Sequence, residues 1–182
     1  MRVDMSNTLE IKFFRDVSLS DPFFNSLKQD YKEFPEWFKR KSSETAYVQY
    51  TDDILSGFMY LKIEDGEAED IEPILPSKRR IKIGTLKVDA HGTKLGERMV
   101  KKAIDSAIVN NVQELYVTIF PKHKPLISLL EEFGFKANGI KKTQNGNETV
   151  LLKSLEQSSI SGYLRQDYPL IDVRTKKCFL LS

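Results

Sequence analysis

The most informative part of the chain is Ile81–Asn110, which reads IKIGTLKVDAHGTKLGERMVKKAIDSAIVN. Alternating apolar residues predict a strand over residues 81–90, and the apolar spacing from Glu97 to Asn110 predicts an amphipathic helix. Its apolar stripe is expected to contain Leu95, Met99, Ala103 and Ala107, widened by Val100, Ile104 and Ile108. Between them lies a basic, glycine-containing turn at residues 91–96. The chain therefore passes from a strand through a tight turn directly into a helix.

The turn at residues 91–96 predicts a site for an anion. The first N–H groups of a helix lack partners and lie at the positive end of the peptide dipoles, so a phosphate placed there gains hydrogen bonds and a favourable field. Gly92 and Gly96 permit close approach of the backbone, and Lys94 adds a mobile positive charge. Glycines also close ordinary strand-to-helix connections, so the turn alone is weak evidence for a phosphorylated ligand.

The flanking sequence predicts further alternation of strands and helices. Residues 114–120 alternate like a strand, and residues 126–133 read as a helix closed by Gly134. Residues 64–76 are acidic, contain glycine and proline, and are expected to form a loop. Asn145-Gly146 is a strong hairpin signal. The other predicted elements lie at residues 9–14, 23–31, 34–41, 45–50, 54–63, 140–143 and 148–155.

This succession resembles the GNAT superfamily of acyl-CoA-dependent N-acyltransferases. The family loop, Arg/Gln-x-x-Gly-x-Gly/Ala, has its counterpart in His91–Gly96, and the family ending Leu-Tyr-Glu-Lys-x-Gly-Phe has its counterpart in Leu129–Phe135. Residues 79–155 carry the specific likeness, whereas residues 9–78 match by element order alone. The resemblance implies an α/β fold over residues 1–155, with a central mixed, splayed, mostly antiparallel sheet flanked by helices.

The resemblance also implies acetyl transfer, or transfer of another short acyl group, from acyl-CoA to a primary amine. Backbone N–H groups of residues 92–97 would hold the diphosphate, and the backbone of Leu86–Val88 would pair with the pantetheine amides. The N–H near Val88 would stabilise the carbonyl oxygen as it gains negative charge. The implied donor contacts are Leu86, Lys87, Val88, His91, Gly92, Thr93, Lys94, Leu95, Gly96, Glu97 and His123.

An alkyl ammonium must lose a proton before its nitrogen can attack a thioester, so a base or a water relay is needed. Asp89, His123 and Tyr116 are the candidate catalytic residues. Each has a structural reading as well: Asp89 as a turn or capping residue, His123 as a histidine bonded to backbone or cofactor, and Tyr116 as a sheet aromatic. Leu130 occupies the position of the family tyrosine that protonates the departing thiolate.

Composition sets limits on function. The chain has 182 residues, 28 basic and 26 acidic side chains and a formal charge of +2, so nothing in its overall charge requires nucleic acid. The single cysteine, Cys178, excludes a disulfide within one chain and favours a cytoplasmic location. The sequence predicts no metal site, because neither histidine has cysteines or carboxylates at metal-ligand spacing. No signal peptide or membrane span is expected.

Aromatic residues in the predicted early helices have two interpretations. They fit the wall of an acceptor groove, which the family places beside these helices, or plain hydrophobic core. The residues concerned are Phe23, Phe24, Tyr31, Phe34, Trp37 and Phe38.

Residues 156–182 begin like a linker and end on apolar, strand-like sequence. We expect either an extra strand against the domain or the start of a second domain beyond residue 182. Two other functions stay open at this point. One is a non-catalytic acyl-CoA-binding regulatory module, suggested by Leu130. The other is a protein- or RNA-associated module that uses the basic residues of 78–80 and 122–124.

Overall fold

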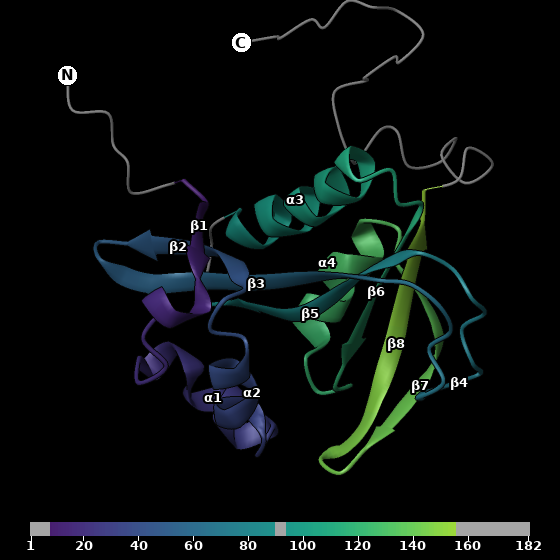
Figure 1. The fold of residues 1–182 in the computed structure, drawn as a ribbon, viewed down its shortest axis with the longest axis horizontal. Helices are drawn as coiled ribbons and strands as arrows, with labels where there is room; N and C mark the ends of the chain where they lie inside the picture. Colours follow the sequence, from purple (N-terminus) through teal and green to yellow (C-terminus); the bar gives the residue numbers. More distant parts are fainter. Residues whose placement is uncertain (1–7, 90–93, 156–182) are drawn as a thin grey trace, which may run out of the picture.

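A computed structural model of the chain describes residues 8–89 and 94–155. The predicted contacts of His91, Gly92 and Thr93, and the predicted role of residues 156–182, lie outside these residues. Figure 1 shows an open eight-stranded sheet in the order β1-β2-β3-β5-β6-β8-β7-β4. Its strands are β1 (Glu10–Phe13), β2 (Thr45–Thr51), β3 (Ile54–Glu64), β4 (Ile71–Glu72), β5 (Arg80–Val88), β6 (Glu114–Ile119), β7 (Lys136–Thr143) and β8 (Gly146–Ser154).

Only the β5–β6 pair is parallel; every other neighbouring pair of named strands is antiparallel. The predicted mixed, mostly antiparallel sheet is therefore confirmed. The helices are η2 (Phe14–Asp16), η3 (Pro22–Phe24), α1 (Asn25–Asp30), α2 (Phe34–Arg40), α3 (Leu95–Val109) and α4 (Lys124–Glu132). No helix of the described residues has the length and apolar character needed to cross a membrane.

Helices cover both faces of the sheet. Side chains of a strand alternate between faces, and Met59 packs with α3 and α4 whereas its neighbours Phe58 and Tyr60 pack with η3 and α2. Most of the early aromatic residues are core: Phe23, Phe24, Phe34 and Phe38 are buried. We call the side covered by α3 and α4 the α3 face, and the side covered by α1 and α2 the α1 face.

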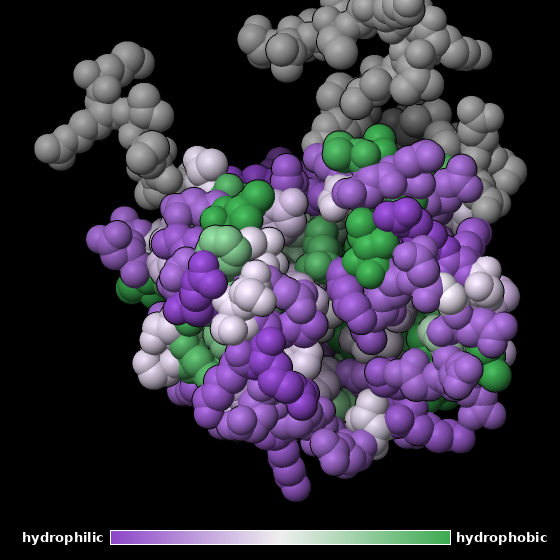
Figure 2. All heavy atoms as spheres, viewed as in Figure 1, coloured by the Kyte–Doolittle hydropathy of each residue, from purple (hydrophilic) through white to green (hydrophobic). Residues whose placement is uncertain are grey.

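The apolar stripe predicted along α3 is confirmed at Leu95, Met99, Ala103 and Ala107, all buried. The prediction was wrong at Ile108, which was expected to widen the stripe but is 58% exposed near the end of the helix. Figure 2 shows that the surface seen in the view of Figure 1 is mostly hydrophilic, with apolar residues in separate patches.

The predicted loop at residues 64–76 contains a short strand, β4, which pairs with β7 at the far edge of the sheet. Ile71 of this strand and Leu75 after it are buried in a cluster with Tyr116 and Val150. Local sequence did not reveal this strand because its prolines and acidic residues are typical of loops and its partner is distant in sequence.

A β-bulge in β5 opens the sheet. Tyr60 on β3 pairs with Thr85 and Leu61 pairs with Ile83, so Gly84 has no opposite residue. Pairing between β5 and β6 ends beside this bulge, at Ile83 with Val117. Because a bulge bends its strand and increases the local twist, β5 and β6 diverge beyond it. The predicted splay is therefore present, and we call the gap between the two strand ends the opening.

The Tyr60 ring requires glycine at position 84. A Cβ atom added to Gly84 would lie 2.8 Å from Tyr60 Cδ1. We expect Gly84→Ala to lower the free energy of unfolding by about 1–3 kcal/mol, the usual cost of overpacking, as measured by urea denaturation. In a Tyr60→Ala background the same change should cost much less, because the contact is gone. An equal cost in both backgrounds would contradict this explanation.

Candidate active site

The divergence leaves backbone groups of β5 exposed to the opening. Asp89 N–H donates to Ser56 O on β3 at 2.9 Å, and antiparallel residues alternate between groups that face the partner strand and groups that face away. Leu86 and Val88 are thus the residues whose N–H and C=O groups point away from β3. No described strand pairs with them there, so β5 presents a free edge to any extended ligand.

Helix α3 begins at Leu95, earlier than the predicted Glu97, with Lys94 as its N-cap residue and no side-chain cap. The N–H groups of Gly96 and Glu97 belong to the first turn and have no intrahelical acceptors. A Cβ atom on Gly96 would lie 2.9 Å from Leu129 Cδ2 of α4, so this glycine also serves helix packing. The first turn of α3 lies near the end of β5, because the Leu95 side chain packs against Gly57, the pairing partner of Val88. The positive end of this helix is a favourable place for an anion.

Helix α1 lies across the opening on the α1 face of the sheet, and Lys87 binds the N-terminal end of this helix. The Lys87 ammonium donates to Phe23 O and to Ser26 Oγ, the latter at 2.8 Å, and it forms an ion pair with Asp89 at 3.2 Å. The Lys87 side chain is largely buried. Sequence reasoning assigned Lys87 a donor contact through its backbone and missed this anchoring role.

The C-terminal end of α1 is bound by residues that follow β6. Asp30 accepts from Lys122 and lies 3.1 Å from Nε2 of His123, the residue that precedes α4. His123 therefore stands at the β6 side of the opening and Asp89 at the β5 side. Both keep partly exposed side chains, 41% for His123 and 49% for Asp89, so water can reach either group.

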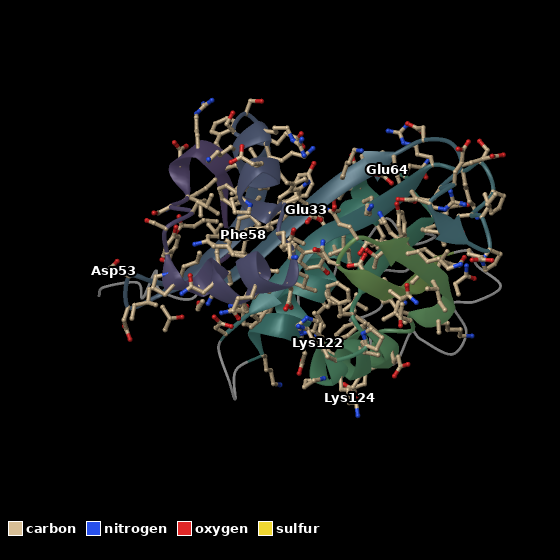
Figure 3. All side chains as sticks on the ribbon, turned by 90° about the horizontal axis from the view of Figure 1, so that it is seen from below. Glu33, Asp53, Phe58, Glu64, Lys122 and Lys124 are labelled. Carbon is tan, nitrogen blue, oxygen red and sulfur yellow. The ribbon has the colours of Figure 1, made fainter. Side chains whose placement is uncertain are left out.

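The turn after α1 contacts the β7–β8 hairpin. Tyr31 donates to Glu148 Oε1 at 2.5 Å, and its ring stacks on Phe120 with centroids 5.1 Å apart. Asn145 donates to both oxygens of Glu33, at 2.9 and 2.8 Å. Figure 3 shows Glu33 near the centre of the molecule, above Lys122 in that view. Tyr31 and Glu148 are 117 positions apart, and no sequence signal connected them.

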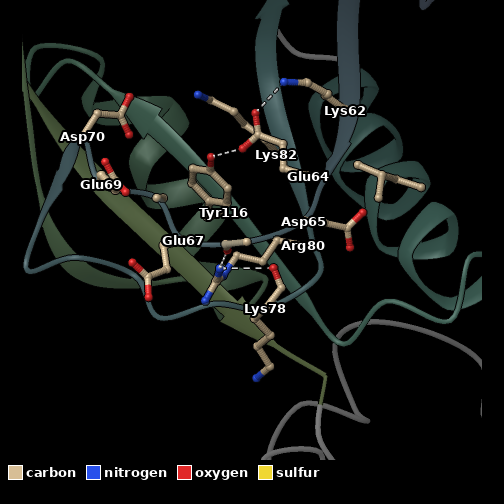
Figure 4. Close-up of a pocket in the computed structure, with 13 residues that line it drawn as sticks. Lys62, Glu64, Asp65, Glu67, Glu69, Asp70, Lys78, Arg80, Lys82 and Tyr116 are labelled. Carbon is tan, nitrogen blue, oxygen red and sulfur yellow. Dashed lines mark hydrogen bonds and ion pairs between the residues drawn. The ribbon is translucent and has the colours of Figure 1, made fainter.

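Tyr116, the third candidate catalytic residue, does not lie at the opening. It pairs with Lys82 in the part of β6 that is still bonded to β5, and its hydroxyl donates to Glu64 Oε2 at 2.5 Å (Figure 4). These residues line a polar cavity of about 550 Å³ beneath residues 65–70. Burial and Glu64 raise the pKa of Tyr116 far above its ordinary value. Tyr116 is thus a neutral donor, and the structure does not bring it to the opening.

Leu130, at the position of the family tyrosine, is fully buried in the core between the sheet, α3 and α4. The residue is therefore part of the hydrophobic core. Among the described residues, no group of three or more His, Cys, Asp or Glu side chains is arranged to hold a metal ion.

Comparison with known proteins identifies the class. A model of the acetyltransferase (GNAT) family matches residues 11–135, more than half of the chain, so the chain belongs to this family. No curated protein matches the sequence.

Solved structures share the fold at low sequence identity. A Staphylococcus aureus Mu50 N-acetyltransferase has a TM-score of 0.58 and 15% identity, over 82% of this chain and 99% of that one. An Elizabethkingia anophelis GNAT acetyltransferase with acetyl-CoA bound has a TM-score of 0.55 and 15% identity, over 82% of this chain and 99% of that one. Arabidopsis thaliana Naa50, in complex with the bisubstrate analogue CoA-Ac-MVNAL, has a TM-score of 0.54 and 16% identity, over 80% of this chain and 98% of that one.

The anchoring role of Lys87 predicts a measurable loss of stability. Lys87→Met should lower the free energy of unfolding by about 1–3 kcal/mol, because it removes charge-assisted bonds that hold α1 to β5. Lys62→Met is the matched control. Its side chain is half exposed and pairs with Glu64, so its loss should cost less than about 0.5 kcal/mol. Equal effects in a urea titration would contradict the anchoring role.

Proposed function

We propose that the chain catalyses transfer of an acetyl or other short acyl group from acyl-CoA to a primary amine. The observation that supports this most is the free edge of β5 at Leu86 and Val88, next to the first turn of α3. Pantetheine carries amides that can pair with such an edge, and its diphosphate would lie at the N–H groups of Gly96 and Glu97, near Lys94. The predicted contacts of residues 91–93 belong to the same proposal.

The acceptor would enter from the α1 face, because the diphosphate of the donor would lie at the first turn of α3, which packs on the other face. Its nitrogen attacks the thioester carbon, the C–S bond breaks, and the thiolate leaves and takes up a proton. The Val88 N–H, which points away from β3, would donate to the carbonyl oxygen as negative charge develops there. Asp89 and His123, on opposite sides of the opening, are the candidates for removing the ammonium proton, directly or through water.

A non-catalytic acyl-CoA-binding module is the second candidate, supported by the buried Leu130 where a general acid is usual in the family. The proposed RNA-associated module has less support. Arg80 and Lys78 are bonded to Glu114, and Lys122 is bonded to Asp30, so these basic residues are already paired within the fold. A cytoplasmic location stays a prediction.

Val88→Pro tests the role of the backbone in catalysis. Proline lacks an N–H group. The N–H group that this change removes points into the opening and not toward β3, so the hydrogen bonds between β5 and β3 remain. We expect kcat for thiol release from acetyl-CoA, with the best amine of a panel, to fall about a hundredfold or more.

The control is Val88→Ala, which shortens the side chain but keeps the N–H group. It should retain kcat within about a factor of three of the unmodified chain. If Val88→Pro turns over at the same rate as Val88→Ala, the proposed stabilisation of the oxyanion is wrong. If the unmodified chain binds acetyl-CoA but releases no thiol with any amine, the non-catalytic alternative is favoured.

A further inference from the structure

Two glutamates of the described chain are buried, Glu114 and Glu148, and they differ in how their charge is balanced. Glu114 accepts from the Arg80 guanidinium and from the Lys78 ammonium, at 3.1 Å for Lys78. Glu148 is only 4% exposed, yet its hydrogen-bond partner among the described residues is the neutral phenol of Tyr31. A buried carboxylate normally has a cation beside it, whereas Glu148 has no ion pair with any of the residues that the structure describes.

One oxygen of Glu148 remains available. The Tyr31 hydroxyl occupies Oε1, while Oε2 has no hydrogen-bond partner among the described residues. Oε2 is also not one of their fully buried, unsatisfied atoms, so it keeps contact with solvent. Burial, followed by the bond to Glu148, raises the pKa of Tyr31 far above its ordinary value, so the phenol stays a donor and fixes the carboxylate.

The other carboxylates around the opening already have partners or lie in water. Asp30 pairs with Lys122 and His123, and Asp89 pairs with Lys87. Glu33 is exposed to water and accepts from the neutral amides of Gln144 and Asn145. Glu148 is therefore the buried carboxylate of this group at which a ligand cation gains a counter-ion without breaking an existing ion pair. The rings of Tyr31 and Phe120 stack next to it and suit the apolar stem of an amine.

Glu148 lies beside the opening but not in it. The next residue, Thr149, pairs with Ile119, which is past the point where β6 separates from β5 at Val117. Strand β8 is the neighbour of β6 on the side away from β5. Glu148 is thus on the order of 10 Å from that point of separation. An ammonium at Glu148 is too far away to be the nitrogen that attacks a thioester held between β5 and β6.

We infer that Glu148 binds a second ammonium group of the acceptor, which makes the preferred substrate a diamine or polyamine. This inference rests on the proposed function. One amine of such a substrate is acetylated in the opening, and its other amine, still protonated, pairs with Oε2 of Glu148 while its methylene chain contacts Tyr31 and Phe120.

The test compares substrates that differ in one charge. The unmodified chain and Glu148→Gln are assayed for thiol release from acetyl-CoA with α,ω-diamines from 1,3-diaminopropane to 1,8-diaminooctane, each beside its n-alkyl monoamine. Glutamine keeps the size of the side chain and an oxygen that accepts from Tyr31. We expect at least one diamine to exceed its monoamine about tenfold or more in kcat/KM, mainly through KM, and we expect Glu148→Gln to abolish that preference.

Glu33→Gln is the matched control, because it removes a charge from the same region at a carboxylate that already has amide donors. It should keep the preference for diamines, and the Kd for acetyl-CoA should be unchanged in both variants. Thiol release without preference for any diamine, or a preference that survives in Glu148→Gln, would overturn the inference while leaving the proposed function intact. Absence of thiol release with every amine, and of acetyl-CoA binding, would instead overturn the proposed function.

Discussion

The contact between Gly84 and the Tyr60 ring is the constraint on which the rest of the site depends. The strand can bulge at residue 84 because no side chain competes with that ring, and pairing between β5 and β6 ends next to the bulge at Ile83. An unbroken β5–β6 ladder would use the N–H groups of Leu86 and Val88 internally. The bulge instead leaves them available, close to the positive end of α3.

The residues proposed for catalysis lie among the contacts that hold α1 to the sheet. Lys87 holds α1 to β5, and Asp30 holds the other end of α1 to Lys122 and His123. These contacts position the turn that carries Tyr31 over the β7–β8 hairpin. Under the proposed function, the donor and the acceptor would meet from opposite faces of one sheet.

Much of the fold could be predicted, because the strand-turn-helix run at residues 81–110 and the Asn145-Gly146 hairpin depend on local periodicity and turn chemistry. The anion site at residues 91–96 was predicted from its glycines and its place before a helix, whereas the splay of the sheet and the assignment of the anion to acyl-CoA were predicted from a family resemblance. Strand β4 and the exposure of Ile108 depend on distant packing, which local patterns do not record. Glu148 was not predicted as a site residue, because a glutamate in a hairpin strand is normally solvated. Only the fold brings Tyr31 against it and buries it.

Hydrogen exchange at individual amides, followed by NMR with and without CoA, tests the central claim most directly. Val88 and Leu86 face the opening, so their amides should exchange rapidly in the free chain and become strongly protected when CoA binds, while the amide of Asp89, bonded to Ser56, changes little. Protection of Leu86 and Val88 that is already present without CoA, or that CoA leaves unchanged, would contradict a donor site on the free edge of β5.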